Sequence, residues 1–201
     1  MADMETAIIL AGGKSSRMGF DKQFLKLRDK YIIEMIAERL ERVFKEIILV
    51  TSKPEEYAKY GFKLVEDEVK DFGPLAGIQV GLKNSRSMHN YIVACDMPFI
   101  NLKYLKYMME LIEQHEGKVD GVITRLGEWI EPFNAFYSKS LLGSIEENIE
   151  KGKRQINFML QSSNVLYISE EKAREFSPDW EMFTNVNTLD DYESLMKQLS
   201  K

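Results

Sequence analysis

The chain has 201 residues, of which 44% are hydrophobic and 11% aromatic, so it can bury a core and has the length of one domain. With 12 glycines and 5 prolines, its composition is neither collagen-like nor of low complexity. The net charge of -5 argues against a broad basic face, and we expect no nucleic-acid partner.

The single cysteine, Cys95, excludes an intrachain disulfide and a thiolate metal cluster and favours a reducing cytosol. No basic segment precedes the first apolar run, and no stretch approaches ~20 uninterrupted apolar residues. We therefore expect a soluble, cytoplasmic protein with no signal peptide and no membrane span.

Short runs rich in Ile and Val alternate with amphipathic patterns in the first half of the chain. The predicted strands are 6–10, 46–51, 63–66 and 91–95. The predicted helices carry apolar residues at three- and four-residue spacing, namely Ile33, Ile36, Leu40 and Val43 in one and Leu102, Leu105, Met109 and Ile112 in another. Asn101 is the expected N-cap of the second helix. This alternation predicts a three-layer α/β fold, with a mostly parallel central sheet and helices on both faces.

The sequence pattern of the second half of the chain predicts a different mixture of strands and helices. Further strands are expected at 121–124, 129–137 and 165–168, and helices at 141–150 and 155–160. Some antiparallel pairing is expected there. A final amphipathic helix carries Leu189, Tyr192, Leu195 and Leu199, with Thr188 as its N-cap. No linker separates the two halves, so residues 1–201 are predicted to form one domain.

The strongest motif follows the first strand, at residues 10–22. Gly12 and Gly13 would let the backbone approach a ligand and turn its amides toward phosphate oxygens, while Lys14, Arg17 and Lys22 add cations. The spacing fits neither the Walker A loop nor the G-x-G-x-x-G pattern. The segment is interpreted as a polyphosphate cradle, and the alternative is a solvated strand-to-helix turn.

A second motif ends the fourth predicted strand. Asp96 follows an almost wholly apolar run, which places one carboxylate at the edge of the sheet where α/β folds bind ligands. Since Mg²⁺ takes one or two carboxylates plus phosphate oxygens, Asp96 is a candidate Mg²⁺ ligand. The alternative is an aspartate that caps the turn before Pro98.

A third motif, residues 73–77, follows the third predicted strand and opens a helix. Its proline at the helix start and glycine one turn later would allow main-chain groups to meet a flat base. A structural helix start explains the segment equally well. Asp67, at the end of the same strand, could hold a ribose hydroxyl or be solvated.

Basic residues at 125–137 and 151–155 and the segment 185–187 are more often surface or capping residues than sites. His89 and His115 have no nucleophile or metal partner in motif spacing, which disfavours a hydrolytic triad or a zinc site.

Together these pieces resemble the molybdenum cofactor guanylyltransferase family within the nucleotidyltransferase superfamily, whose fold is Rossmann-like. The matching segments are 10–22, Glu66-Asp67, 73–77, Cys-Asp-Met-Pro at 95–98 and Asn-Val-Asn-Thr at 185–188. They span nearly the whole chain. Two departures are Val50-Thr51-Ser52, where family members often carry Asn, and Leu189 in place of a common Pro.

The resemblance implies a role for each matching residue. Nucleotide-binding residues would be Leu10, Ala11, Gly12, Gly13, Lys22, Asp67, Gly73, Gly77 and Asp96, with Thr51 as the substitute for the missing Asn contact. Arg17, Lys22 and Asp96 would serve catalysis, and Asp96 would hold Mg²⁺ as the cofactor ion. Arg154, Asn185 and Asn187 would bind molybdopterin.

The implied reaction is transfer of GMP from GTP to molybdenum-molybdopterin with release of pyrophosphate. Molybdopterin-inserting and molybdoenzyme-maturation proteins would be its protein partners. Two alternatives stay open from the residues alone. One is a cytidylyl- or sugar-phosphate nucleotidyltransferase on the same fold, and the other is a non-catalytic GTP-binding regulator.

Overall fold

A seven-stranded mixed sheet forms the centre of the protein. The computed structural model describes residues 3–11, 26–27, 29–66 and 72–199. Across the sheet the strands are, in order, β5 (Lys63–Glu66), β4 (Glu46–Thr51), β1 (Thr6–Leu10), β6 (His89–Ala94), β8 (Trp129–Ser138), β7 (Gly121–Leu126) and β9 (Val165–Ser169). Of these seven strands, β8 alone runs antiparallel to its neighbours, β6 and β7. The parallel pairs are β5–β4, β4–β1, β1–β6 and β7–β9. The mostly parallel sheet with antiparallel pairing in the second half is therefore confirmed.

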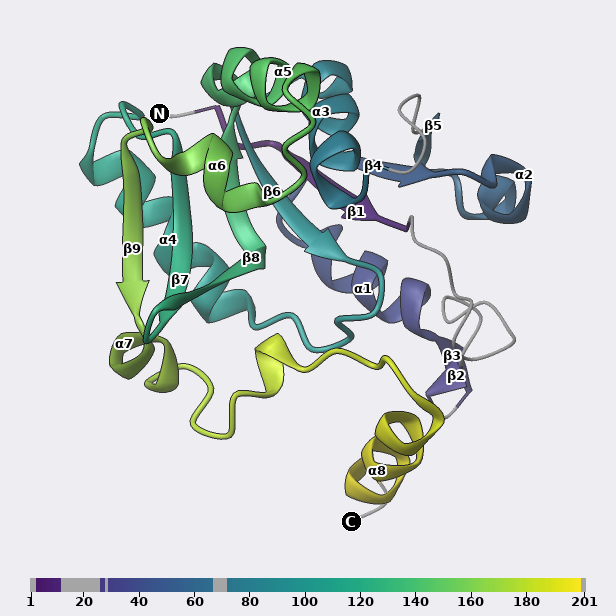
Figure 1. Cartoon of the computed structure of the whole chain (residues 1–201). Coiled ribbons are helices and arrows are strands. Elements are labelled where there is room, and N and C mark those ends of the chain that lie inside the picture. The colour runs from purple at the N-terminus through teal and green to yellow at the C-terminus, as the bar shows by residue number, and fades with distance from the viewer. Residues whose placement is uncertain (1–2, 12–25, 28, 67–71, 200–201) are drawn as a thin grey trace.

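Alternating side chains of β1 divide the apolar interior into two cores. Ala7 and Ile9 point to one core and Ile8 and Leu10 to the other, because successive strand residues face opposite sides. The first core is covered by α1 (Ile32–Leu40) and α4 (Leu102–Gln114). The second is covered by α3 (Pro74–Asn84), α5 (Leu142–Glu150) and α6 (Ile156–Leu160). Figure 1 shows these two helical layers on either side of the sheet, as the predicted three-layer fold requires.

The two predicted N-caps are confirmed. Asn101 Oδ1 accepts hydrogen bonds from the amides of Lys103, at 3.0 Å, and Tyr104, at 3.1 Å. Thr188 Oγ1 accepts from the amide of Asp191 at 3.1 Å at the start of α8 (Leu189–Leu199). The Asp191 carboxylate accepts in return from the Thr188 amide at 2.8 Å, which completes a capping box.

Several predicted element boundaries needed correction, most clearly those of β6 and α1 and that of β7, which runs to Leu126 and not to Thr124. Strand β6 begins at His89, two residues before the predicted start, because His89 and Asn90 are polar yet fully inside the protein. Helix α1 ends at Leu40, so Val43 lies in the turn that follows and not on the helix.

Several strands and helices of two to five residues were not predicted from the sequence, since they are too short to show a helical or strand period. They are β2 (Lys26–Leu27), β3 (Lys30–Tyr31), α2 (Pro54–Tyr57), η2 (Ala58–Tyr60), η3 (Lys139–Leu141), α7 (Glu170–Arg174) and η4 (Glu181–Phe183). Among the described helices, none combines the length and hydropathy that a membrane span needs.

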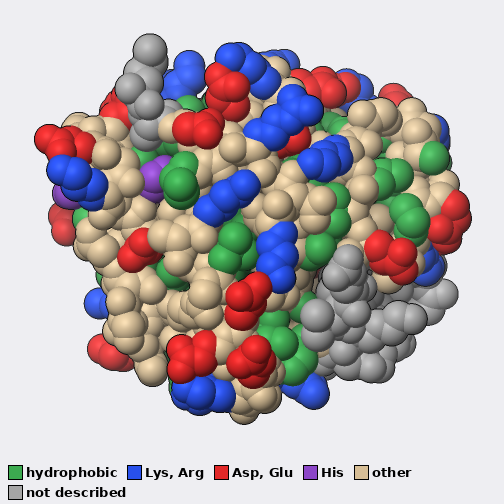
Figure 2. Space-filling view, turned by 90° about the horizontal axis from the view of Figure 1, so that it is seen from above, with side chains coloured by type: hydrophobic (Ala, Val, Ile, Leu, Met, Phe, Trp, Pro, Cys, Tyr) green, Lys and Arg blue, Asp and Glu red, His purple; other side chains and the backbone are tan. Residues whose placement is uncertain are grey.

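The surface carries both signs of charge. On the face seen in Figure 2, Lys and Arg side chains alternate with Asp and Glu across the described residues. The described residues on this face form no broad basic patch of the kind that binds a polyanion without regard to sequence.

Two glycines let α3 pack directly on the sheet. A Cβ atom on Gly81 would lie 2.7 Å from Ile8 Cγ2, and one on Gly77 would lie 3.3 Å from Leu10 Cδ2. Because real Cβ contacts are longer than the first of these distances, Gly81 sets the separation between α3 and β1.

We expect Gly81→Ala to lower the free energy of unfolding by about 1–3 kcal/mol through overpacking against Ile8. Gly143→Ala is the matched control, because no atom lies within 4 Å of the added Cβ in α5. That variant should raise the free energy of unfolding by about 0.4–1 kcal/mol. Urea denaturation of both measures this, and equal effects of the two variants would contradict the packing role of Gly81.

Candidate functional site

The carboxyl ends of three neighbouring strands bring predicted ligand-binding residues to one edge of the sheet. Ala11 follows β1, Thr51 ends β4 and Asp96 follows β6. The amide of Ala11 donates to the Val50 carbonyl at 2.8 Å, and the amide of Cys95 donates to the Leu10 carbonyl at 3.0 Å. The ends of β1, β4 and β6 therefore stay hydrogen-bonded to their neighbours up to the edge of the sheet. Figure 1 shows this edge beside α1 and α3. In open α/β sheets this is where ligands bind.

The C-terminal segment crosses this edge at Asp96. The amide of Val186 donates to the main-chain carbonyl of Asp96 at 2.9 Å. Asp96 itself is half-buried, and Asn185 and Asn187 on either side of Val186 are exposed. The structure thus brings two predicted molybdopterin residues to the predicted metal ligand, although 90 residues separate Asp96 from Val186 in the sequence.

The residues at this edge fit a magnesium ion that shares its ligands with a nucleotide. Asp96 supplies one carboxylate at the end of an apolar strand. In the described part of the chain, no three His, Cys, Asp or Glu side chains gather closely enough to hold a metal ion by themselves. Mg²⁺ does not need such a cage, since it takes one or two carboxylates and fills its shell with water and phosphate oxygens.

Leu10 and Ala11 have buried side chains, so anything they offer a ligand comes from the backbone. Thr51 is also buried, and its Oγ1 accepts a hydrogen bond from the Lys53 amide at 3.1 Å. This bond shows Thr51 organising the turn after β4. Its contact with a nucleotide stays a prediction.

The two glycines of the segment 73–77 have different roles. Gly73 caps α3 with φ 72° and ψ -155°, a backbone conformation that is essentially restricted to glycine. The side-chain position of Gly77 faces Leu10 and Val50 in the core, so close approach of a ligand is not why glycine stands there. The expected reason for Gly77 was therefore wrong, and nucleotide contacts through its main chain stay a prediction.

Arg154 lies beside the turn that leads into α3. Its guanidinium is 5.4 Å from the ring centroid of Phe72, the residue before Gly73. The structure therefore joins Arg154 to the Gly73 turn, whereas Asn185 and Asn187 are joined to Asp96. Gly12, Gly13, Arg17, Lys22 and Asp67 lie outside the described residues.

A buried asparagine that the sequence analysis missed holds the C-terminal segment in place. Asn134, in β8, accepts a hydrogen bond from the Tyr91 hydroxyl at 2.6 Å and donates to the Met182 carbonyl at 3.1 Å. Burial raises the pKa of Tyr91, with the neighbouring Tyr104 adding to the effect, so the hydroxyl keeps the proton that it donates. Asn134 also has φ 58°, which asparagine tolerates better than most residues. One signal was available, a polar residue inside the apolar run 133–137.

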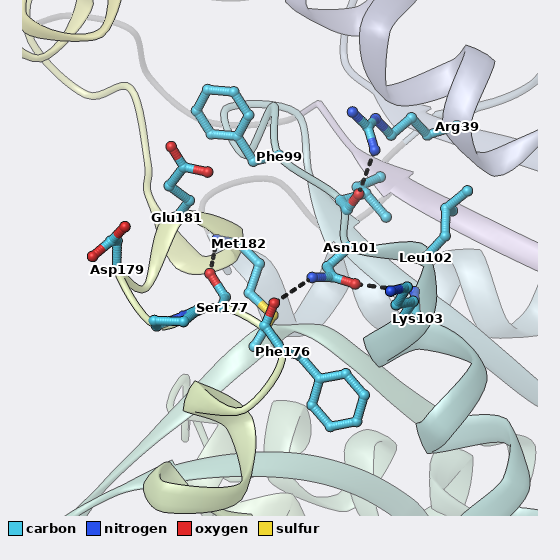
Figure 3. A pocket seen from close by; sticks show the side chains of 12 residues that line it. Arg39, Phe99, Asn101, Leu102, Lys103, Phe176, Ser177, Asp179, Glu181 and Met182 are labelled. Atoms are coloured by element: carbon cyan, nitrogen blue, oxygen red, sulfur yellow. Dashed lines mark hydrogen bonds between the residues drawn. The ribbon is translucent and has the colours of Figure 1, made fainter. Parts of the chain in front are cut away.

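A cavity of about 480 Å³ lies beside this segment, between the chain that follows β6 and the chain that precedes η4 (Figure 3). In it, Asn101 Nδ2 donates to the Phe176 carbonyl at 2.7 Å, and Arg39 donates to the Ile100 carbonyl at 3.2 Å. The Asn101 bond joins the two walls, and the Arg39 bond ties the first wall to α1. None of the predicted site residues that the structure describes lines this cavity.

Comparisons with known proteins agree with this geometry. Residues 7–165 match the family described as MobA-like NTP transferase domain. The chain is 51% identical over 189 residues to a probable molybdenum cofactor guanylyltransferase of Peptoclostridium acidaminophilum, covering 92% of this chain and 86% of the relative. It is 48% identical over 193 residues to the molybdenum cofactor guanylyltransferase of Syntrophotalea carbinolica, covering 96% of this chain and 91% of the relative.

Among solved structures, the crystal structure of molybdopterin-guanine dinucleotide biosynthesis protein A from Archaeoglobus fulgidus matches with a TM-score of 0.82 and 28% identity. The match covers 97% of this chain and 98% of that one. The sheet, its ligand-binding edge and these matches define a nucleotidyltransferase. The chain belongs to the MobA-like NTP transferase family, and the family resemblance inferred from its motifs is confirmed.

We expect Asn134→Ala to lower the free energy of unfolding by about 2–4 kcal/mol, because it leaves the Tyr91 hydroxyl and the Met182 carbonyl without their shared partner. The amide of Val186 should also exchange its hydrogen faster. Asn148→Ala is the control, since the side chain of Asn148 is buried but hydrogen-bonds only within its own helix. An equal loss in both variants, or unchanged exchange at Val186, would contradict the role of Asn134.

Proposed function

We propose that this chain transfers GMP from GTP to molybdenum-molybdopterin, which releases pyrophosphate and forms the molybdopterin guanine dinucleotide cofactor. The observation that carries this proposal is the identity of about half of all residues to guanylyltransferases along nearly the whole chain. The hydrogen bond that joins Val186 to Asp96 supports it, since Asn185 and Asn187, which we assign to the acceptor, flank Val186.

The reaction requires the protein to bind two anionic phosphate groups next to each other. A terminal phosphate oxygen of molybdopterin attacks the α-phosphorus of GTP, a new P–O bond forms, and the bond to the β-phosphate oxygen breaks. The attacking group is already an anion, so no side chain needs to remove a proton and no covalent protein intermediate is required. The catalytic contribution is alignment of the two phosphates and stabilisation of the charge that grows on pyrophosphate.

We assign these tasks to the motif at residues 10–22 and to Asp96. Arg17 and Lys22 would stabilise the leaving pyrophosphate, and Gly12 and Gly13 would bind phosphate oxygens through their amides. Asp96 would hold Mg²⁺, which when bound neutralises phosphate charge.

The two substrates would meet at the carboxyl edge of the sheet beside Asp96. The main chain at Leu10, Ala11, Gly73 and Gly77, with Thr51 and Asp67, would bind the nucleotide. Arg154, Asn185 and Asn187 would bind molybdopterin. Since Arg154 lies beside Phe72, its contact would come from the α3 side of the edge.

We further propose that residues 1–201 form a single domain, which the continuous seven-stranded sheet supports. The protein would act in the cytoplasm and hand its product to molybdopterin-inserting and molybdoenzyme-maturation proteins. The single cysteine fits a reducing compartment.

The decisive experiment incubates the protein and Mg²⁺ with molybdenum-molybdopterin and each of the four nucleoside triphosphates, and measures pyrophosphate release. We expect GTP to be used about 10²-fold or more faster than CTP, because a wrong base leaves buried polar groups unpaired. Equal or faster use of CTP would identify a cytidylyltransferase. GTP binding without pyrophosphate release would identify a regulator.

Asp96→Asn should reduce the rate of transfer by at least about 10²-fold while GTP binding and the circular dichroism spectrum persist, since the amide keeps the shape but loses the charge that holds Mg²⁺. Asp190→Asn, an exposed aspartate in the first turn of α8, is the control and should retain full activity. A folded Asp96→Asn protein with a normal rate would remove Asp96 from the site.

A further inference from the structure

Two side chains at the start of β8 have no role in the mechanism above. Glu131 is half-buried and lies opposite Thr124 of β7. Trp129, two residues earlier and opposite Leu126, is 77% exposed. Because side chains two apart on a strand share a face, the indole and the carboxylate lie on the same side of the sheet.

Glu131 is a carboxylate with no compensating partner in the described part of the chain. No hydrogen bond or ion pair reaches it there, and burial alone raises its pKa. A polar group that loses water without gaining a partner costs folding free energy. Glu131 therefore does nothing for the stability of the described fold.

Glu46 shows how the same fold treats a structural glutamate. Its carboxylate is also half-buried, yet it accepts hydrogen bonds from the Thr6 hydroxyl at 2.8 Å and the Arg86 amide at 3.1 Å. Burial opposes ionisation of Glu46, but these bonds and the nearby charges of Lys63 and Arg86 outweigh it and lower the pKa. In the described part of the chain, no comparable set of hydrogen-bond donors reaches the Glu131 carboxylate.

A break in strand pairing sets where Glu131 points. The register between β7 and β8 shifts between Val122 and Thr124, and Asn134 has a positive φ within the same stretch of β8. Such bulges re-aim side chains and occur next to active sites. Thr124 hydrogen-bonds to Tyr104 of α4, so Glu131, its cross-strand neighbour, lies on the α4 face, where Asn134 holds the C-terminal segment.

The position of β8 in the sheet puts this pair on the side of β6 away from the predicted nucleotide-binding strands β1 and β4. Strand β8 lies next to β6, on the side away from β1. Because β8 is antiparallel to β6, its first residues lie toward the carboxyl edge of the sheet, the edge at which Asp96 follows β6. A molecule over the start of β8 would therefore lie at the same edge of the sheet as a nucleotide bound over the ends of β1 and β4.

We propose that Glu131 and Trp129 bind the pterin ring of the acceptor and select it, an inference that rests on the proposed function. The 2-amino-4-oxo pyrimidine edge of a pterin presents two adjacent N–H donors, which match the two oxygens of one carboxylate. The indole supplies a flat apolar face for the ring to stack on. Glu131 is thus a specificity residue, and the unfavourable burial of its carboxylate is relieved when the pterin binds.

The first test is steady-state kinetics of Glu131→Gln with molybdenum-molybdopterin and GTP. We expect the KM for the acceptor to rise about tenfold or more, because one oxygen acceptor becomes an N–H donor, while the KM for GTP stays unchanged. Glu128→Gln is the matched control, since Glu128 is exposed in the same hairpin and its substitution removes the same charge. A rise in the KM for GTP, or no change in either KM, would overturn the assignment.

The second test uses binding without turnover. Calorimetric titration compares pterin with lumazine, which carries a carbonyl oxygen in place of the 2-amino group. The wild-type protein should bind pterin more tightly than lumazine, and Glu131→Gln should lose that preference. Trp129→Ala should weaken binding of both rings by a similar factor. Equal binding of the two rings by the wild-type protein would overturn the role of Glu131.

The third test is stability against pH. The folded-state pKa of Glu131 is raised above the ordinary 4.5, so its ionisation destabilises the folded protein as pH rises through that folded-state value. Glu131→Gln should therefore melt at a higher temperature than wild type near neutral pH, and the difference should vanish below pH 4.5. Glu128→Gln should show no such difference. A lower melting temperature for Glu131→Gln at neutral pH would show that the carboxylate has a structural partner and would overturn the proposal.

These outcomes separate the proposal from the function on which it rests. A wild-type protein that transfers no nucleotide to molybdenum-molybdopterin would refute the proposed function and this use of Glu131 together. A wild-type protein that is active, with Glu131→Gln unchanged in acceptor KM, would refute only the assignment of Glu131 and Trp129.

Discussion

The two buried hydrogen bonds of Asn134 are the constraint on which the arrangement of the site depends. They connect β6, through Tyr91, to β8 and then to Met182 in the C-terminal segment. From Met182 it is only four residues to Val186, whose amide bonds to Asp96. Because each partner is inside the protein, losing one bond would strand a polar atom without water, and the network forms as a unit. The asparagines at 185 and 187 owe their place beside Asp96 to a side chain in another strand.

The strands of the first half of the sequence and the two helix N-caps could be predicted because local chemistry determines them. Runs of Ile and Val gave β1, β4 and β5 at their observed bounds, and Asn101 and Thr188 act as caps through bonds to residues two or three positions away. The site motifs could also be placed, since Asp96 follows an apolar strand whose direction fixes the edge that it reaches.

The remaining features depend on tertiary contacts that leave no periodic signal. The early start of β6 requires knowing that His89 and Asn90 are buried, and the role of Gly77 requires knowing that α3 packs on Leu10. The importance of Asn134 arises from partners 43 and 48 residues away. Glu131 is harder still, because its significance lies in having no described partner, which a sequence cannot display.

Reversal of a single strand has a consequence for how this fold can diversify. Because β8 runs against its neighbours, the short hairpin that joins β7 to β8 projects from the same edge as the ends of β1, β4 and β6. The hairpin turn at Gly127 and Glu128 is exposed, and no side-chain hydrogen bond from it to the β1–α3 half is present in the described residues. Its length and composition can therefore vary while the packing of α3 on β1 stays as it is. A fold built this way can exchange one reactant for another by altering a surface turn, and retain the half that recognises the other reactant.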